Sequence, residues 1–480
     1  MKMQPLTPTL SRRERGNLRS RSLLALTLAA VASLYLTGLG IGFCSDDFFL
    51  LNWGRYAASS WELLQPVPNW YYRPLVLLLS RWEAQLLGQP APLAHALSLA
   101  FHLLACGLVW SRLRRLGTGA WPAAFAVCWF GFHPLSVETV AWTAGRADLL
   151  SALGVLAAAE LLGRKRDGWS LPGLAAAALA IALLAKESAA IAPLLIGADL
   201  MARSRRPRSK EFLSLLPAAV LVAVYLIAVR PGSPTEIHGL VAAAAHLAIC
   251  FVAIFLPWPS NPLDLLAAHP GSLALRGIFL AAGLVLAGLL LLGWRRGDPR
   301  IRTGIAWGLI ALIPAALYQG LQARYIYLPA AGAVSLAAVA AERLARSSKR
   351  LAPVLAVGVL ALAGSTIEIQ LLAWRQAGKL CREIPRRTRI LYPNGLPGDP
   401  SRFRRTRIVG APDHLAALYP YAPAYVFREG AMEALLWEYR DLYPPAPWLR
   451  TLPYAAAQGQ AARPQWRFEP RRGALVWSGP

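Results

Sequence analysis

The feature that most constrains this chain is a succession of apolar stretches of about membrane-spanning length, running from about residue 22 to residue 372. Crossing the hydrocarbon core of a bilayer takes roughly 20 apolar residues in a helix. A secretion signal would supply one such stretch near the start, whereas here they follow one another along most of the sequence. The pattern therefore predicts an all-α polytopic membrane protein.

The basic residues are distributed as the topology of such a protein requires. The formal charge is +25, but half of the 50 Lys and Arg residues lie in short clusters between apolar stretches, and 17 more lie beyond residue 373. Such clusters are typical of cytoplasmic loops. They indicate a membrane topology and argue against nucleic acid as a partner. The clusters occupy residues 2–21, 112–115, 164–166, 203–210, 295–302 and 343–350.

Alternating the apolar stretches with these clusters predicts about eleven transmembrane helices. The stretch 246–258 is predicted to be in-plane or re-entrant, because counting it as a crossing would put the cluster at 295–302 outside. The predicted crossings are residues 23–43, 93–110, 121–132, 149–162, 171–185, 189–201, 213–229, 273–294, 305–317, 328–341 and 351–372.

Three regions follow from this count. Residues 1–21 form a cytoplasmic basic N-terminus, and residues 22–372 form the membrane domain, with a long external loop at 44–92 whose Trp and Tyr content suits helices lying in the interface. Residues 373–480 are predicted to be a soluble extracytoplasmic domain with a small α/β structure. Strands are expected at 424–430 and 473–479, and a helix at 431–443.

Adjacent carboxylates at Asp46 and Asp47 stand where the first helix leaves the membrane. One of them is suited to act as a general base toward an acceptor hydroxyl, and the other to bind a metal or hold a basic residue. The alternative is a solvated helix end that happens to be acidic. For a metal ion, should one bind, the candidate ligands are Asp46, Asp47 and His133; the sequence leaves a divalent cofactor open.

Further ionisable residues gather in short connections on the same side. The turn FHPLSVETVAWTAGRADLL carries His133, Glu138, Arg146 and Asp148, and a cation such as Arg146 could neutralise a phosphate there. The alternative is a helix-capping network. LLAKES adds Lys186 and Glu187, whose alternative role is an ion pair that serves packing only. QARYIYLP adds Arg324 and Tyr325, whose alternative role is anchoring at the membrane interface. Charge beside membrane helices is costly, which makes all of these functional candidates.

The order of these motifs, with NWYYRPL around Arg73, resembles the membrane portion of the tetratricopeptide-repeat transmembrane O-mannosyltransferases and their bacterial relatives, in the GT-C superfamily. The resemblance spans roughly residues 40–345. The HP…E…GRADLL block is its most specific element. The second histidine of the family's HPxHTE motif is replaced by Ser136, followed by Val137, and no tetratricopeptide repeats are present.

The resemblance implies a GT-C-like fold and inverting transfer of a sugar, with mannose as one candidate, from a polyprenyl-phosphate donor to an acceptor hydroxyl outside the cytoplasm. It implies that Asp46 or Asp47 is the catalytic acidic residue. Substrate-binding residues would be those that match the family's motifs: Arg73, His133, Glu138, Arg146, Asp148, Lys186, Glu187, Arg324 and Tyr325. The cations Arg146, Lys186 and Arg324 are expected to bind the donor phosphate.

Three other functions remain open at this point. One is a non-catalytic assembly protein, for which replacing the carboxylates would have no effect. A transporter or flippase would show internal repeats and charges at mid-membrane, and the sequence has no visible repeat. A ligase-like enzyme of the O-antigen type would use diphosphate-linked donors. The partners expected are the lipid-linked sugar, membrane lipid and an unidentified protein or glycan acceptor. Composition and the absence of an N-x-S/T sequon favour a bacterial inner membrane. A Cys44–Cys381 disulfide is feasible if both residues face an oxidising compartment.

Overall fold

The structure is a computed structural model, in which the placement of most of the chain is described. The described residues are 12–66, 71–86, 91–164, 170–203, 212–229, 239–255, 271–295, 297–317 and 322–396, followed in the tail by 407–409, 414–415, 424–427, 431–438, 465–472 and 474–477.

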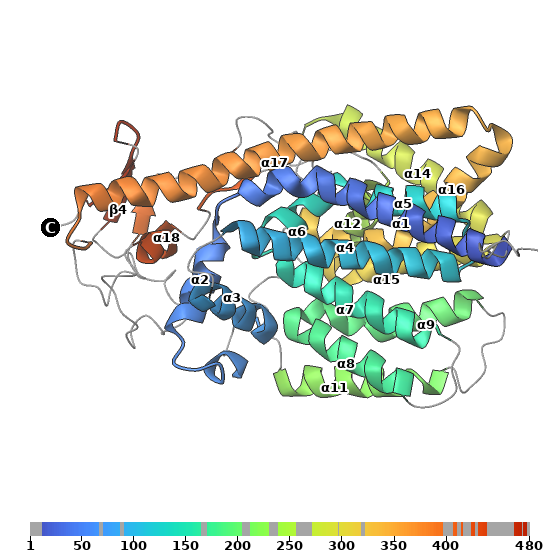
Figure 1. Cartoon of the computed structure of the whole chain (residues 1–480), viewed down its shortest axis with the longest axis horizontal. Helices are drawn as coiled ribbons and strands as arrows, with labels where there is room; N and C mark the ends of the chain where they lie inside the picture. The colour runs from blue at the N-terminus through green and yellow to red at the C-terminus, as the bar shows by residue number, and fades with distance from the viewer. Residues whose placement is uncertain are drawn as a thin grey trace, which may run out of the picture.

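The protein is a mostly helical polytopic membrane protein, in which long helices run side by side along the longest axis (Figure 1). The helices are α1 (Arg12–Tyr35), η1 (Leu36–Gly40), α2 (Asp46–Tyr56), η2 (Glu62–Leu64), α3 (Pro74–Leu86), α4 (Ala91–Arg115), α5 (Ala120–Gly131), η3 (Pro134–Ser136), α6 (Val137–Ala141), α7 (Arg146–Leu162), α8 (Ser170–Ala185), η4 (Glu187–Ile191), α9 (Ala192–Arg203), α11 (Leu216–Val229), α12 (Leu240–Ala253), α14 (Leu273–Arg295), α15 (Pro299–Leu317), η5 (Ala323–Ile326), α16 (Tyr327–Ser347), α17 (Leu351–Leu391) and α18 (Ala431–Glu438).

Within the described residues, six helices are long and apolar enough to cross a membrane. A seventh crossing results if α5 is joined to η3 and α6, although that pair is bent by 52°. The six correspond to predicted crossings on α1, α4, α14, α15, α16 and α17. The other five predicted crossings lie on α5, α7, α8, α9 and α11, which have between 12 and 17 residues each.

Small residues let the helices pack closely. A Cβ added at Gly154 of α7 would lie 2.6 Å from the Ala178 carbonyl oxygen of α8. Only glycine permits that approach, and close backbone contact is how helices gain packing energy in lipid, where no hydrophobic force drives them together. The large apolar side chains that remain exposed, such as Leu284, Val285 and Leu289 on α14, face outward, where hydrocarbon is the expected neighbour.

The two ends of the bundle differ in chemistry. The end that contains the first residues of α1 also holds the C-termini of α4 and α9, where Arg112 and Asp199 form a buried ion pair of 2.6 Å. At the opposite end lie α2 and α3, the two helices of the long loop predicted at 44–92 (Figure 1). The connections that carry the candidate site residues all lie at this second end.

The last membrane helix is longer than predicted. The sequence predicts that it ends at Leu372, but α17 continues to Leu391. Hydropathy falls after Leu372 because the exposed face becomes basic, whereas the buried face keeps its helical spacing through Trp374, Cys381 and Thr388. At the usual rise of 1.5 Å per residue its 41 residues extend about 60 Å, roughly twice the thickness of the hydrocarbon core. The predicted boundary between membrane domain and tail at residue 373 thus falls inside one helix.

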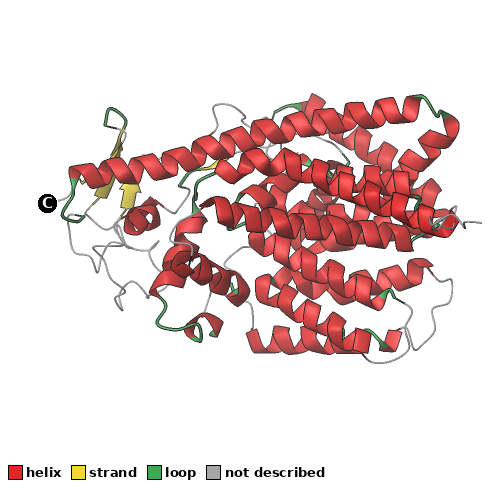
Figure 2. Cartoon of the chain, in the orientation of Figure 1, coloured by secondary structure: helices red, strands yellow, loops and turns green. Residues whose placement is uncertain are grey.

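The described part of the tail packs against the end of α17. The strands are β1 (Arg407–Val409), β2 (His414–Leu415), β3 (Ala424–Tyr425), β4 (Gln465–Glu469) and β5 (Ala474–Trp477). One sheet has the order β1-β4-β5, parallel between β1 and β4 and antiparallel between β4 and β5, and the other pairs β2 with β3. The Leu475 amide donates to Thr388 Oγ1 of α17 at 2.9 Å. Figure 2 shows the strands toward the end of the molecule where α18 lies.

Candidate active site

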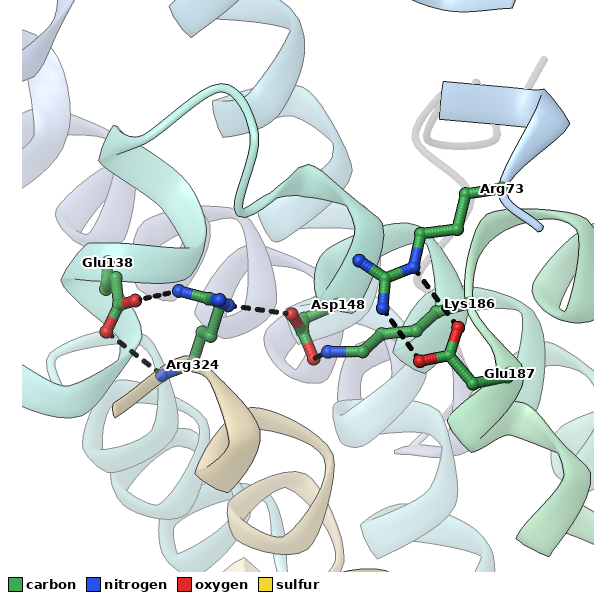
Figure 3. A network of polar contacts seen from close by, with 6 residues as sticks. All are labelled: Arg73, Glu138, Asp148, Lys186, Glu187 and Arg324. Atoms are coloured by element: carbon green, nitrogen blue, oxygen red, sulfur yellow. Dashed lines mark hydrogen bonds and ion pairs between the residues drawn. The ribbon is translucent and has the colours of Figure 1, made fainter. Parts of the chain in front are cut away.

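The connection between α5 and α7 folds back sharply and places two of the predicted acidic residues together. After α5, His133 caps η3, and α6 follows at an angle. The chain then turns at Gly145, where an added Cβ would lie 2.6 Å from the Glu138 carbonyl oxygen, so that only glycine fits. Glu138, before the turn, and Asp148, after it, consequently reach the same cation, Arg324 (Figure 3).

Six predicted residues form two groups of ion pairs that lie beside each other (Figure 3). Arg324 pairs with Glu138 through its side chain and also approaches Asp148, with Nε 3.5 Å from Oδ2. The other carboxylate oxygen of Asp148 accepts from Lys186 Nζ at 2.6 Å. In the second group Arg73 grips Glu187 with two hydrogen bonds of 2.7 and 3.1 Å.

Aromatic rings support the cations of this network. The Arg324 guanidinium lies 4.9 Å from the ring centroid of Trp142 and 5.1 Å from that of Tyr325, and Lys186 Nζ lies 4.4 Å from Tyr325. Arg73 lies 4.3 Å from the ring of Tyr71. Such contacts stabilise a cation where water is scarce. Trp142 was not among the residues singled out in the sequence, although it stands inside the same motif.

The charges of the network balance: three cations face three carboxylates, and their side chains are only 7–27% exposed. Burying charge is costly without a partner, which accounts for the pairing. Burial by itself would raise the pKa of Glu187, but the adjacent Arg73 guanidinium and the Lys186 ammonium lower it to about 2. A site of this kind can accept an incoming phosphate when the cations exchange a carboxylate partner for it.

Asp46 and Asp47 have different environments although they are neighbours. Asp47 is 1% exposed and accepts hydrogen bonds from the Cys44 amide at 2.9 Å and the Ala144 amide at 2.7 Å. Burial raises the pKa of Asp47 to about 8, against the lowering effect of these two donors. Asp46 is half-buried and accepts from the Ser45 hydroxyl at 3.2 Å. Asp47 therefore fastens the loop, and Asp46 is the more accessible carboxylate.

The loop that carries this pair is joined to the network by direct contacts. The indole N–H of Trp142 donates to the Cys44 carbonyl oxygen at 3.2 Å, and the Trp142 ring faces Arg324. Ser45, immediately before the carboxylates, has φ of 51°, a left-handed conformation that costs energy for a residue other than glycine. Backbone strain of this kind concentrates at functional sites.

Arg146 and His133 lie outside the network. The Arg146 guanidinium is 1% exposed and engages Glu83 at 2.7 Å, Ser98 at 3.0 Å and the Ala94 carbonyl oxygen at 2.8 Å. It holds α3 and α4 against α7. This arrangement differs from the expectation of a phosphate contact, because every nitrogen of the guanidinium is already engaged in the core. The sequence places its partner Glu83 among the acidic residues of the same side, but nothing in that amphipathic stretch indicates the pairing with Arg146.

His133 has both ring nitrogens in contact with main-chain groups. Its Nδ1 accepts from the Leu135 amide at 3.3 Å, and its Nε2 lies 3.0 Å from the Ile254 carbonyl oxygen, to which it donates. The ring therefore ties α12 to the break between α5 and α6. Within the described residues no group of three or more His, Cys, Asp or Glu side chains is arranged to hold a metal ion.

Comparison with known proteins gives two kinds of similarity. No protein-family model matches the chain. A stretch of 156 residues is 30% identical to the protein O-mannosyl-transferase Tmtc2 of Drosophila melanogaster, covering 30% of this chain and 16% of that protein. The sequence match confirms the resemblance to GT-C membrane glycosyltransferases that the motifs predict, although the chain spans only that small share of its curated relative.

Two solved structures are also similar in outline. One is ArnT from Cupriavidus metallidurans in the apo state, with a TM-score of 0.45 and 16% identity, covering 88% of this chain and 78% of that chain. The other is the same protein bound to undecaprenyl phosphate, with a TM-score of 0.40 and 16% identity over 87% and 77% of the two chains.

Proposed function

We propose that this protein is an inverting glycosyltransferase, which moves a sugar from a polyprenyl-phosphate donor to an acceptor hydroxyl at the extracytoplasmic face of a bacterial inner membrane. Mannose is the first sugar to test, because the curated relative is named an O-mannosyltransferase. The observation that carries the proposal is the convergence of Arg73, Lys186 and Arg324 with the Asp46 loop at one end of the bundle.

The proposal includes the finer topology. The short helices α5, α7, α8, α9 and α11 complete eleven crossings together with the six long ones, and the tail is an extracytoplasmic α/β domain. The basic clusters support this sidedness, since Arg112, Arg115 and Arg300 lie at the end opposite to the site. The site then faces outward at the depth where the phosphate of a lipid-linked donor is anchored.

Each charged group has a role in this scheme. Lys186 and Arg324 bind the donor phosphate, with Arg73 beside them, and Tyr325 shields the cations from water. Glu138, Asp148 and Glu187 hold the cations in place while no donor is bound. A phosphate that displaces these carboxylates gains charge-assisted hydrogen bonds at a site that already has the right geometry.

The chemical step needs one base and one stabilised leaving group. Asp46 takes the proton of the acceptor hydroxyl, whose oxygen attacks the anomeric carbon from the face opposite the phosphate. The bond between that carbon and the phosphate oxygen breaks with inversion, and polyprenyl phosphate leaves with its charge neutralised by Lys186 and Arg324. Asp47, Arg146 and His133 act as positioning residues, because their polar atoms contact the protein core.

The test uses the full-length protein in lipid vesicles with radiolabelled polyprenyl-phosphate mannose and a cell-envelope extract as acceptor. Asp46→Asn and Lys186→Met are each expected to reduce transfer by at least about 100-fold, the scale of losing a general base or a charge-stabilising group. The control is Arg346→Gln, at the opposite end, where the side chain is 78% exposed. Full activity in Asp46→Asn would end the assignment of the base.

The same experiment separates the two other activities, and full absence of transfer and of lipid movement would favour a non-catalytic assembly protein. Movement of the labelled lipid from one leaflet of the vesicle membrane to the other, with no sugar transferred to an acceptor, would identify a flippase. Product formed only from diphosphate-linked donors would identify a ligase-like enzyme. Mass spectrometry of the lipid consumed and of the product distinguishes all three results.

A further inference from the structure

The segment that leads into the carboxylate loop crosses the last helix at unusually short range. A Cβ added at Gly378 of α17 would lie 2.5 Å from the Gly42 nitrogen, and one added at Gly42 would lie 2.9 Å from the Gly378 carbonyl oxygen. The two backbones therefore touch at a point where each needs a residue without a side chain. Side chains placed shortly after this crossing on both segments are forced to meet.

The residues that meet there are two cysteines. Cys44 lies two residues after Gly42 and Cys381 one helical turn after Gly378, so the crossing brings their side chains together. The Cys44 thiol donates to the Gly42 carbonyl oxygen at 3.3 Å. A third segment closes over them, because the Val426 carbonyl oxygen accepts from the Ser45 amide at 2.8 Å and from the Cys381 thiol at 2.9 Å. Both cysteines are 1% exposed.

We propose that Cys44 and Cys381 are joined by a disulfide in the mature protein. The inference rests on the proposed function for one premise only, that this end of the bundle faces an oxidising compartment. The two thiols give up two protons and two electrons to the disulfide of a thiol-oxidising protein, which is released as a dithiol while the sulfur–sulfur bond forms.

The bond must form before packing is complete. In the folded protein burial raises the pKa of Cys44 well above its ordinary value, and the thiolate is the species that exchanges disulfides. A pair sealed in this way is also protected from later reduction.

The position of the bond gives it a specific consequence for the site. It fixes the residue two places before Asp46 to α17, about two helical turns beyond Trp374, which stacks on Trp142 with ring centroids 6.0 Å apart. Trp142 in turn faces Arg324. A single covalent link would thus help to fix the position of the proposed base, Asp46, relative to the proposed phosphate-binding cation, Arg324.

The test counts free thiols in the wild-type protein, so its result does not depend on whether a variant folds. Membranes are quenched in acid, and the protein is then denatured at neutral pH in the presence of N-ethylmaleimide, which alkylates free thiols. The mass of the full-length protein is measured by mass spectrometry, with and without prior reduction. We expect three of the five cysteines to be alkylated before reduction and all five after it. A non-reduced digest should contain one cross-linked peptide pair, joining Cys44 to Cys381.

Matched variants check the assignment. Cys250→Ser should leave the cross-linked pair intact and lower the alkylated count by one, whereas Cys381→Ser should leave four cysteines that all react without reduction. Five reactive thiols in the wild-type protein, or a different pair, would overturn the inference. Sugar transfer is a separate readout: free thiols with normal transfer refute the disulfide alone, and a disulfide without transfer refutes the function alone.

Discussion

At pH 4, replacing Asp47 by Asn should destabilise the protein, whereas the same change at Asp46 should not. Asp47 accepts two buried main-chain N–H groups, at 2.9 and 2.7 Å. Asn keeps one acceptor oxygen and turns an NH₂ group toward the other donor, so one hydrogen bond is lost and a buried N–H is left unsatisfied. That loss costs about 1–3 kcal/mol. Asp46 is half-buried, and its substitution should change stability by no more than about 0.5 kcal/mol.

The assay is unfolding in mixed micelles with a rising fraction of SDS, followed by the fluorescence of the tryptophans. The pH dependence gives a second measurement with a defined sign. Because burial raises the pKa of Asp47 to about 8, the folded state holds this proton more tightly than the unfolded state, and its contribution to stability falls as pH rises toward 8. The stability advantage of wild type over Asp47→Asn should therefore be largest near pH 4 and shrink as pH rises from 4 to 8. Equal stability at pH 4, or an advantage that grows with pH, would refute the reasoning.

Two further predictions concern the groups around the network. Glu187→Gln should lower the free energy of unfolding by about 2–3 kcal/mol at pH 7, because it removes the carboxylate that Arg73 binds. Since the pKa of Glu187 is lowered to about 2, the difference in stability between wild type and variant should be constant above pH 4.5 and disappear as pH falls toward 2. The same unfolding assay measures it. Trp142→Phe removes the hydrogen bond from the indole N–H to the Cys44 carbonyl oxygen and part of the ring beside Arg324. It should lower the free energy of unfolding by about 1–3 kcal/mol and weaken binding of the lipid donor. Unchanged stability and unchanged affinity in titrations with the lipid donor would contradict this.

The sequence was sufficient to predict which charged residues gather at one end of the bundle, but not the contacts of each one. The spacing of apolar stretches and basic clusters placed Glu138, Asp148, Lys186 and Arg324 at one end of the bundle, and the structure brings these four into one network. The clustering of these charges has a simple cause. Alternating crossings leave few arrangements for short connections, so charges in them have only one place to gather.

The assignment of adjacent residues depended on contacts that a local pattern does not contain. Successive residues on a helix point about 100° apart, so one carboxylate of the Asp46–Asp47 pair faces the core, and which one depends on Ala144, 97 residues further along the chain. Arg146 had the same ambiguity. Its partner Glu83 comes from a separate amphipathic helix, and the ion pair removes a cation that the motif alone suggested for phosphate binding.

The extent of α17 was missed because hydropathy averages over all faces of a helix. After Leu372 the exposed face changes to Arg375 and Lys379, which lowers the average, while the buried face continues with Trp374 and Ala377. The mean hydropathy of a helix therefore does not show where it ends when its exposed face changes from apolar to basic and its buried face does not.

The continuity of α17 makes the tail and the membrane part mechanically one body. The helix has no interruption between Leu351 and Leu391, and its Trp374 stacks on Trp142. The tail strands contact the C-terminal end of α17, so a displacement of the tail would be transmitted along one helix to Trp374 and, through the ring contact, to Trp142.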